Sequence, residues 1–327
     1  MPVSEFEIIQ RYFSHAGSRR DDVVLGVGDD AALLRVPPNT ELAVAMDTLV
    51  EGVHFPVGTD PAAVGHKALA VNLSDLAAMG AEPAWATLAL TLPEPDTGWL
   101  EGFARGFAAL AERFRVQLVG GDTTRGPLTV TVQAHGLVAV GRALRRDGAR
   151  PGDEIYVTGT LGDAGLGLRL IQEAIAVPAM HRNFLVERLE YPQPRVRAGT
   201  ALCELASATI DVSDGLLSDL GHILEQSGVG ATVWVDWLPR SVAFRETLDG
   251  RPGFEAQWDH LPLAGGDDYE LCFTAAPERR ADLERALAAL DCGYRRVGVI
   301  EPAAGLRCRH DDGSPCAAGA GGYRHFG

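Results

Sequence analysis

Lysine is almost absent from this chain of 327 residues, in which Lys67 is the single example. A phosphate-binding loop of the GxxxxGK(S/T) type needs a lysine after glycine, whereas Lys67 follows His66, so this class of nucleotide site is excluded. The lysine and HRD motifs of protein kinases are missing as well. The formal net charge is −15 and no basic patch stands out, so a nucleic-acid partner is not expected.

Cysteine is also scarce, and all five cysteines lie in the second half of the chain without a CxxC pair: Cys203, Cys272, Cys292, Cys308 and Cys316. This usage favours a reduced, cytoplasmic protein. Cys308, His310 and Cys316 suggest a partial zinc site, but a fourth ligand is missing and the spacing fits no zinc pattern, which favours a solvated loop. No signal-peptide pattern opens the chain and no uncharged apolar run reaches the ~18 residues of a membrane span, so no membrane partner is expected.

Helix and strand patterns alternate along the chain, which indicates an α/β or α+β fold. The length fits two domains, which we expect at residues 1–144 and 150–327, joined by the polar linker RRDGARPGD at 145–153. In the first domain the pattern predicts helices at 4–14, 60–79 and 98–114 and strands at 24–27, 31–36, 42–46, 85–92, 116–119 and 128–140. In the second it predicts helices at 163–175, 195–206, 216–227 and 278–290 and strands at 154–158, 208–211, 231–236, 269–275 and 294–300.

Aspartates recur at the ends of the expected strands and on one helix: Asp29, Asp30, Asp47, Asp75, Asp122, Asp211, Asp214, Asp267 and Asp268. Each one alone has an ordinary explanation as a turn former, a helix cap or a solvated carboxylate. The strand-end loops of an α/β layer, however, tend to gather at one rim. Carboxylates ~5 Å apart repel by about 3 kcal/mol per pair at an effective dielectric of ~20, so several of them converge only around cations. Oxygen-only ligands select Mg²⁺ or Ca²⁺, and Mg²⁺ shares its shell with substrate phosphates.

Glycines and arginines near these aspartates fit a phosphate site that has no lysine. The glycine pairs at 120–121 and 265–266 would let backbone N–H groups approach phosphate oxygens closely. Arg145 and Arg146 in the linker would supply positive charge, although a solvated linker explains them equally well. The residues alone therefore predict a site of several Mg²⁺ ions that binds a polyphosphate.

The same segments, in order, resemble the thiamine-monophosphate kinase family, which shares a superfamily with aminoimidazole ribonucleotide synthetase, selenophosphate synthetase and a hydrogenase-maturation protein. The resemblance covers nearly the whole chain and rests on GVGDDAA, MDTLVEGVHF, HKALAVNLSDLAAMGAEP, GGDTTRG, RRDGARPGDEIYVTGTLGDAGLGL, DVSDGLLSDL, GGDDYELCF and GYRHF. It implies a homodimer in which the N-terminal α/β domains pair their sheets into a β-barrel. It also implies a C-terminal α/β domain, with ATP bound between the two domains.

The resemblance further implies that ATP phosphorylates thiamine monophosphate to thiamine diphosphate with several Mg²⁺ ions as cofactors. The Mg²⁺ ligands would be Asp30, Asp47, Asp75, Asp122, Asp211 and Asp214, of which Asp75 and Asp211 are the catalytic candidates. ATP would contact Gly121, Asp122, Arg146 and Ser213, and thiamine monophosphate would contact His54, Asp267 and Tyr323. Because these aspartates are committed to metal and no cysteine falls in the matched positions, we expect direct in-line transfer without a phosphoenzyme.

Two positions depart from the family pattern. Ala45 and Met46 stand where the family usually has hydroxyl residues before Asp47, which puts one Mg²⁺ ligand in doubt. Asp267 stands where the family commonly has Glu, so its carboxylate reaches less far.

The related functions differ from this pattern at identifiable residues. Selenophosphate synthetase has a reactive cysteine and a lysine near its start. The hydrogenase-maturation protein ends in cysteine, and the ribonucleotide synthetase has a lysine near its first glycine loop. This chain has none of these residues. A non-catalytic Mg-nucleotide-binding or Ca²⁺-binding protein is the remaining alternative, and the complete set of carboxylates argues against it.

Overall fold

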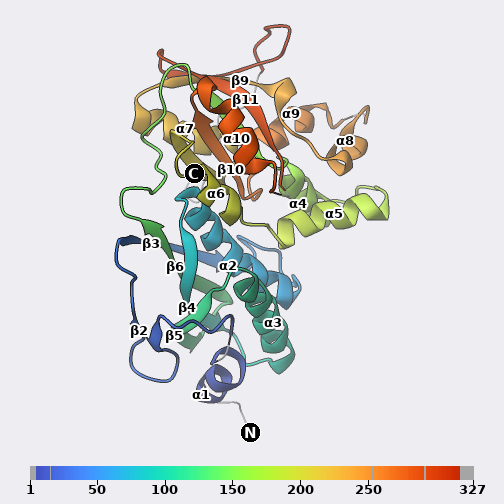
Figure 1. Ribbon diagram of the computed structural model, residues 1–327. Helices are drawn as coiled ribbons and strands as arrows, with labels where there is room; N and C mark the ends of the chain where they lie inside the picture. Colours follow the sequence, from blue (N-terminus) through green and yellow to red (C-terminus); the bar gives the residue numbers. More distant parts are fainter. Residues whose placement is uncertain (1–4, 15, 252, 291, 317–327) are drawn as a thin grey trace. The chain divides into compact units, whose positions relative to one another are not determined.

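The computed structural model describes residues 5–14, 16–251, 253–290 and 292–316 and divides the chain into two compact units (Figure 1). Unit 1 comprises Met1–Leu76 and Ala81–Gly141, and unit 2 comprises Ala77–Gly80 and Arg142–Gly327. Each unit has its own sheet with helices packed against it, which makes this a mixed α/β fold of two domains. Within the described ranges, no helix is long and apolar enough to cross a membrane.

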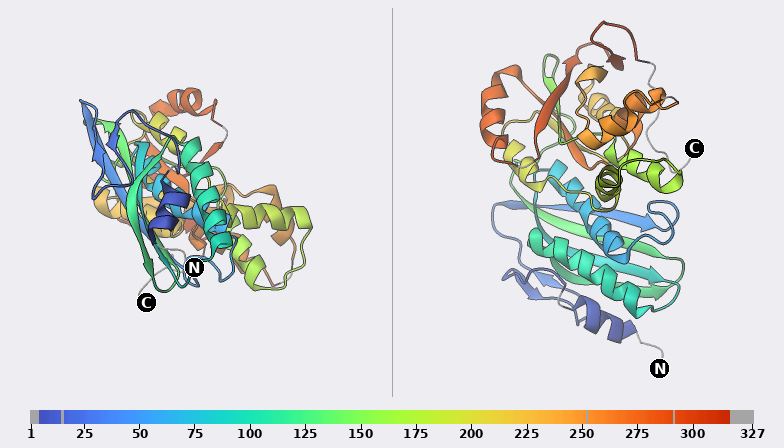
Figure 2. Two further views of the ribbon diagram at one scale, coloured as in Figure 1. Left: turned by 90° about the horizontal axis from the view of Figure 1, so that it is seen from below. Right: turned by 90° about the vertical axis from the view of Figure 1, so that its right-hand side faces the viewer.

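Unit 1 is built on a four-stranded sheet in the order β3-β6-β4-β5. Its strands are β3 (Thr40–Val50), β4 (Glu82–Leu92), β5 (Gln117–Arg125) and β6 (Thr129–Ala139), and only the β4–β5 pair is parallel. Figure 2 shows α2 (Pro61–Ala78) and α3 (Thr97–Arg113) together on one face of this sheet. The small ribbon of β1 (Val23–Leu25) and β2 (Leu33–Leu34) packs around Trp85 and Val119 of the sheet. No strand of the described residues closes this sheet into a barrel.

Helix α2 is buried on nearly all sides because its residues are small and apolar. It begins at Pro61, directly after Asp60, whose side chain accepts a hydrogen bond from the Ala62 N–H at 3.0 Å. Its contact with α3 is at backbone distance, since a Cβ on Gly106 would lie 1.9 Å from the carbonyl oxygen of Ala62. This close packing fixes the helix that carries Asp75.

Unit 2 is built on a six-stranded sheet in the order β12-β9-β11-β7-β10-β8. The strands are β7 (Glu154–Thr158), β8 (Ala208–Val212), β9 (Gly230–Trp234), β10 (Glu270–Ala275), β11 (Tyr294–Glu301) and β12 (Gly305–Arg309). The helices are α4 (Asp163–Gln172), α5 (Ala179–Glu190), α6 (Val196–Leu202), α7 (Leu216–Ser227), α8 (Val242–Leu248), α9 (Glu255–Ala264) and α10 (Arg280–Leu287). The apolar residues of α7 join the core of the sheet, while α4, α5, α8 and α9 form a second apolar cluster.

Several elements differ from the sequence expectation. The expected helix at 4–14 is a short α1 (Glu5–Ile8) followed by a π-helical turn at Ile9–Phe13. The expected helix at 278–290 begins as a 3-10 turn before α10. Four elements of unit 2, namely α5, α8, α9 and β12, were not predicted at all. Helix α9 contains Pro262, which is an unfavourable residue inside a helix, so the local sequence argued against it.

Candidate functional site

A cavity of about 620 Å³ in unit 1 brings together two of the aspartate-bearing segments. Its wall includes Asp29 and Asp30 from the turn after β1 and Asp122 from β5. The Asp29 carboxylate accepts a hydrogen bond from the Asp30 N–H at 2.8 Å, and both residues are exposed. Two chain segments far apart in sequence therefore present carboxylates to one water-accessible space.

Gly121 lies in the wall of the same cavity and has a structural reason to be glycine. A Cβ at this position would lie 1.9 Å from the carbonyl oxygen of Leu88 on the neighbouring strand β4. Strand packing therefore requires glycine here, and the requirement leaves backbone instead of a side chain beside Asp122. The expected role of Gly121 in nucleotide binding is compatible with this contact but is not needed to explain it.

Asp47 and Asp75 lie on β3 and α2, two elements that Asn72 joins. The Asn72 side-chain oxygen accepts a hydrogen bond from the Asp47 N–H at 3.1 Å, and its amide donates to the Ala68 carbonyl at 3.1 Å. Asn72 is fully buried, whereas Asp47 and Asp75 are half-buried. Since Asn72 and Asp75 are three residues apart on one helix, they share a face. The buried amide thus fixes β3 against the helix face that carries Asp75.

His54 lies in the turn after β3, where one ring nitrogen is already engaged. Its Nδ1 accepts a hydrogen bond from the Val50 N–H at 3.0 Å, so the proton of the neutral ring is on Nε2. The Nζ of Lys67 lies 3.4 Å from the His54 carbonyl oxygen. The turn is therefore fixed from two sides, and the Nε2–H can act as a hydrogen-bond donor.

In unit 2, Asp211 lies on β8 and is buried, and Ser213 and Asp214 lie in the turn from β8 to α7. A buried carboxylate that no motif pointed to holds this turn. Asp219, 3% exposed, accepts backbone hydrogen bonds through Oδ2 from the N–H groups of Ser213 at 3.0 Å, Asp214 at 3.1 Å and Gly215 at 3.1 Å. These three N–H groups lie in the turn that leads into α7, of which Gly215 is the N-cap. Asp219 therefore fixes the backbone of the turn that carries Asp214, whereas Asp211 is fixed by the pairing of β8 with β10.

Burial raises the pKa of Asp219 from 3.8 to about 8, and the neighbouring charges of Asp211 and Asp214 add to the shift, against the effect of the backbone hydrogen bonds. Three carboxylates thus share a small volume in which ionisation of all three is unfavourable. A divalent cation would relieve this repulsion. This observation supports a cation site at the β8–α7 turn.

The segment GGDDYEL is attached to the same turn through its backbone. The Asp267 N–H donates to the Ser213 carbonyl at 2.8 Å, and the Tyr269 N–H donates to the Val212 carbonyl at 2.9 Å. Asp267 and Tyr269 have φ values of 60° and 50°, in the left-handed region that non-glycine residues rarely adopt. The structure therefore brings the predicted substrate residue Asp267 beside the predicted metal and nucleotide residues of unit 2.

The next two acidic residues of this segment are buried and have structural partners. Asp268 accepts a hydrogen bond from the Gly162 N–H at 2.7 Å and so caps the start of α4; burial raises its pKa. Glu270 is 0% exposed and lies 2.9 Å from Arg188 and 2.5 Å from Arg195 in two ion pairs. A buried carboxylate between two arginines holds β10 against α5 and the start of α6, a role that the sequence analysis did not foresee.

The remaining predicted residues have less defined surroundings. Arg145 forms an ion pair with Asp147 at 2.6 Å on the surface. Arg146 is exposed, and its carbonyl accepts a hydrogen bond from the Ser227 hydroxyl at 2.9 Å. Tyr323 lies outside the described residues.

The donor sets on the two units suit Mg²⁺. Unit 1 carries Asp30, Asp47, Asp75 and Asp122, and unit 2 carries Asp211 and Asp214. All are carboxylates, and oxygen-only donor sets bind hard divalent cations. In unit 1, Gly121 adjoins Asp122 in the wall of the cavity, where a phosphate could approach the backbone closely.

Comparison with known proteins gives consistent matches along the chain. The family model for "AIR synthase related protein, N-terminal domain" matches residues 28–138, and that for the C-terminal domain matches residues 150–311. Thiamine-monophosphate kinase of Salmonella typhimurium is 49% identical over 328 residues, covering 100% of this chain and 99% of that protein. The crystal structure of thiamine-monophosphate kinase from Stenotrophomonas maltophilia is 50% identical, with a TM-score of 0.84 over 91% of this chain and 93% of that one. The structure of AaThiL complexed with AMPPCP and TMP is 31% identical, with a TM-score of 0.77 over 92% of each chain.

Proposed function

The chain belongs to the thiamine-monophosphate kinase family, and we propose on this basis that it transfers the γ-phosphoryl group of ATP to thiamine monophosphate, giving thiamine diphosphate. The observation that carries the proposal is the similarity over the full length of the chain, at 49% identity, to a thiamine-monophosphate kinase. AaThiL, which is similar over 92% of this chain, binds AMPPCP and TMP together. A kinase of this type must likewise hold a nucleotide and an acceptor at the same time.

Asp30, Asp47, Asp75, Asp122, Asp211 and Asp214 would hold several Mg²⁺ ions, with Asp75 and Asp211 as the catalytic residues. When bound, these ions neutralise phosphate charge and align donor and acceptor. Burial is the main cause of the raised pKa of Asp219, and the charges of Asp211 and Asp214 raise it further. This second contribution is repulsion that a cation at the turn would relieve. Asp219 itself is a positioning residue, because its carboxylate is occupied by backbone N–H groups.

For the nucleotide, Gly121, Asp122, Arg146 and Ser213 would contact ATP. The cavity beside Gly121 and Asp122 offers backbone groups next to carboxylates, the combination suited to a metal-bound polyphosphate. Arg146 is exposed and so is accessible to an anion.

For the acceptor, His54, Asp267 and Tyr323 would bind thiamine monophosphate. The Nε2–H of His54 would donate to the acceptor phosphate, because Nδ1 already accepts from Val50. The half-buried Asp267 would face the cationic thiazolium ring, and Tyr323 would stack on it as a cation–π partner.

The transfer would be direct and in line, because the aspartates are committed to metal and the acceptor phosphate is already ionised near neutral pH. With a chiral γ-phosphoryl group the expected result is inversion at phosphorus. Net retention would instead require a covalent phosphoenzyme and would overturn this mechanism.

The protein would act as a cytoplasmic homodimer, with residues 1–144 as the dimerisation and Mg-ATP-binding domain and residues 150–327 as the C-terminal domain. On β3, the alternating residues Leu42, Val44 and Met46 are exposed on one face of the sheet. A second copy that pairs its own sheet with this one would bury these side chains and form the barrel that the described strands of one chain do not close.

ADP release by the purified protein with Mg·ATP, in the presence and absence of thiamine monophosphate, tests the function most simply. A kinase of this substrate releases ADP in proportion to the acceptor added. A non-catalytic nucleotide-binding protein would bind Mg·ATP and release no ADP under either condition.

A further inference from the structure

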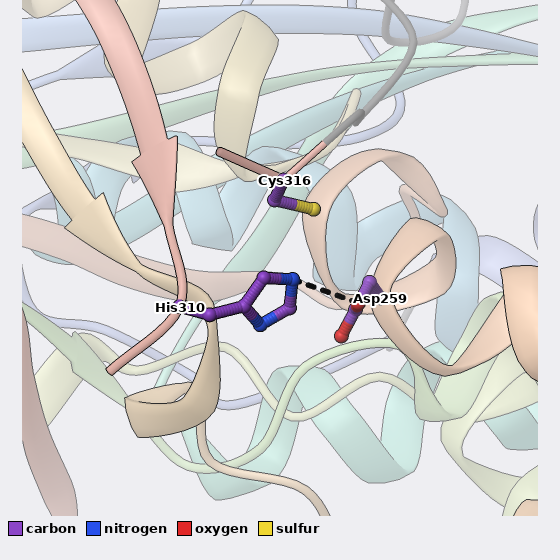
Figure 3. A group of neighbouring side chains, drawn as sticks. All are labelled: Asp259, His310 and Cys316. Carbon is purple, nitrogen blue, oxygen red and sulfur yellow. Dashed lines mark ion pairs between the residues drawn. The ribbon is translucent and has the colours of Figure 1, made fainter. Parts of the chain in front are cut away.

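Three side chains of unit 2 that are not among the predicted Mg²⁺ ligands converge at the surface beside β12 (Figure 3). They are Asp259 of α9, His310 directly after β12, and Cys316. Each offers one ligand atom, and the three atoms lie within 4.8 Å of one another. The His310 Nε2 lies 3.8 Å from the Asp259 Oδ2. Neighbouring ligand atoms around a tetrahedral zinc ion are about 3–4 Å apart, given the usual bond lengths.

The imidazole of His310 is held from its other side by a second carboxylate. The Nδ1 of His310 lies 3.2 Å from the Oδ1 of Asp236, and the Oδ2 of Asp236 accepts from the Asp311 N–H at 2.8 Å. A carboxylate on the far nitrogen is the arrangement that orients metal-binding histidines. It leaves Nε2 facing Asp259.

The carboxylate of Asp259 is oriented in the same way, by Arg240. The Arg240 Nη2 lies 3.0 Å from Oδ1 of Asp259, while Oδ2 is the oxygen that faces His310. Arg240 is itself fixed, because it donates to the carbonyls of Trp258 and Val235 and its side chain is 6% exposed. Arg240 is therefore held in place, and it orients the Asp259 carboxylate so that Oδ2 faces His310.

Cys316 is placed by a short hairpin. The His310 N–H donates to the Ser314 carbonyl at 2.9 Å, and the Cys316 N–H donates to the Cys308 carbonyl at 3.0 Å. Cys308 and Cys316 are thus opposite each other, and His310, two residues after Cys308, projects from the same face of the hairpin. This geometry explains why His310 and Cys316 meet, and Figure 3 shows the Cys316 sulfur above the ring and beside Asp259.

We propose that Asp259, His310 and Cys316 form a binding site for a zinc-class divalent cation, with water as the fourth ligand. A mixed nitrogen, oxygen and sulfur donor set selects borderline-soft transition ions and discriminates against Mg²⁺. A cation here would tie the hairpin at 308–316 to α9. Its ligands are not among those proposed for Mg²⁺, so a test of this site does not depend on the proposed kinase reaction.

In the sequence, Cys308, His310 and Cys316 lack a fourth ligand and fit no zinc spacing. In the structure, the third member of the group is Asp259 and not Cys308. Asp259 is about 50 residues away in sequence, so local spacing could not reveal it. The cluster of ion pairs around His310 is the competing explanation, and it requires no metal and no role for the thiol.

Cobalt titration of the reduced full-length protein separates the two explanations. Excess Mg²⁺ occupies the oxygen-only sites, and the near-ultraviolet charge-transfer band of a Co²⁺–thiolate bond reports the proposed site alone. The wild type should develop this band to one equivalent and lose it when Zn²⁺ is added. Cys316→Ser should abolish the band, and Asp236→Asn should weaken Co²⁺ binding by about 10-fold or more with all three ligands still present.

Cys203→Ser is the matched control, since it removes a thiol of unit 2 outside the cluster and should leave the band unchanged. Circular dichroism of each metal-free variant establishes that it is folded. The proposal is overturned if the wild type shows no thiolate band, or if Cys316→Ser retains it. If folded Asp236→Asn bound Co²⁺ as tightly as the wild type, His310 would not be a metal ligand oriented by Asp236, and the proposal would fail.

Discussion

At the residue scale, some carboxylates of the candidate site can be predicted from sequence motifs, whereas Asp219 becomes evident only from the fold. Asp30, Asp122, Asp211 and Asp214 lie in short segments that contain glycine at or near strand ends, so residue type and position predicted them as site candidates. Asp219 lies inside α7, where an aspartate usually indicates a solvated face. Its burial and its hydrogen bonds to the β8–α7 turn depend on how α7 packs against the sheet, which the local sequence does not determine.

Asp219→Asn should change how stability depends on pH in the presence of a chelator. Because the pKa of Asp219 is raised from 3.8 to about 8, the native state holds this proton more tightly than the unfolded state does. Its contribution is therefore complete below about pH 4 and is lost as the pH rises to about 8. The variant cannot ionise, so its free energy of unfolding should rise relative to that of the wild type across this window. Denaturant unfolding at several pH values measures this difference.

The exposed Asp249→Asn is the control for this experiment and should follow the wild type. Parallel pH curves for Asp219→Asn and the wild type would show that the carboxylate is ionised in the folded protein without metal.

Asp75→Asn should abolish most activity while preserving the fold, because it removes a metal ligand and keeps the shape of the side chain. We expect kcat to fall by at least about 10³-fold, roughly 4 kcal/mol of transition-state stabilisation. The free energy of unfolding should stay the same or rise, since carboxylate repulsion is relieved. Steady-state kinetics at saturating ATP and Mg²⁺ measure the first effect, with the exposed Asp21→Asn as control. Near-normal turnover would remove Asp75 from the catalytic site.

At the element scale, strands and amphipathic helices are predictable because their apolar residues recur with a fixed period. Helix α7 has this property, and it was expected at 216–227, where the structure has it. Helices α5 and α9 lack a regular apolar stripe, and α9 contains Pro262, so tertiary packing in the second apolar cluster decides their conformation. The length of β3, which runs to Val50, likewise follows from its pairing with β6 along its whole length.

Glu154 joins three elements of unit 2, since it pairs with Arg280 of α10 and Arg296 of β11 and accepts from the Tyr156 hydroxyl at 2.7 Å on β7. Glu154→Gln should lower the free energy of unfolding by about 1.5–3 kcal/mol at neutral pH, the usual range for hydrogen bonds to charged groups. The Arg280 hydrogen bond holds the pKa of Glu154 at about 2 instead of 4.5. The stabilisation is therefore complete above about pH 4.5 and is lost as the pH falls towards about 2.

Unfolding of wild type and Glu154→Gln at neutral and acidic pH tests this account. The difference between them should shrink on acidification, whereas the exposed Glu278→Gln should match the wild type throughout. A difference that stays constant down to about pH 3 would mean that lost packing, not the charge, destabilises the variant.

At the scale of the whole molecule, the two-unit fold and the family both follow from ordered motifs that span the chain. Assembly is harder to infer, because it depends on surfaces. The exposed face of β3 is the feature of unit 1 that a second copy would cover, and Met46 on it is 63% exposed.

Met46→Lys should convert a dimer into a monomer at micromolar concentration, because pairing would bury an uncompensated charge. Sedimentation velocity measures this change. Met180→Lys on α5, at an equally exposed position in unit 2, should remain dimeric. A wild-type monomer, or a Met46→Lys protein that still dimerises, would contradict pairing through β3.

The most direct test of the central claim is the product formed by the purified protein from Mg·ATP with thiamine monophosphate or with thiamine. Only the phosphorylated compound offers a metal-binding acceptor phosphate, so thiamine diphosphate should form from thiamine monophosphate while thiamine remains unchanged. Chromatographic separation of the thiamine compounds, with Asp75→Asn as the inactive control, gives the answer. Absence of thiamine diphosphate, or equal phosphorylation of thiamine, would contradict the assigned reaction even if the fold is correct.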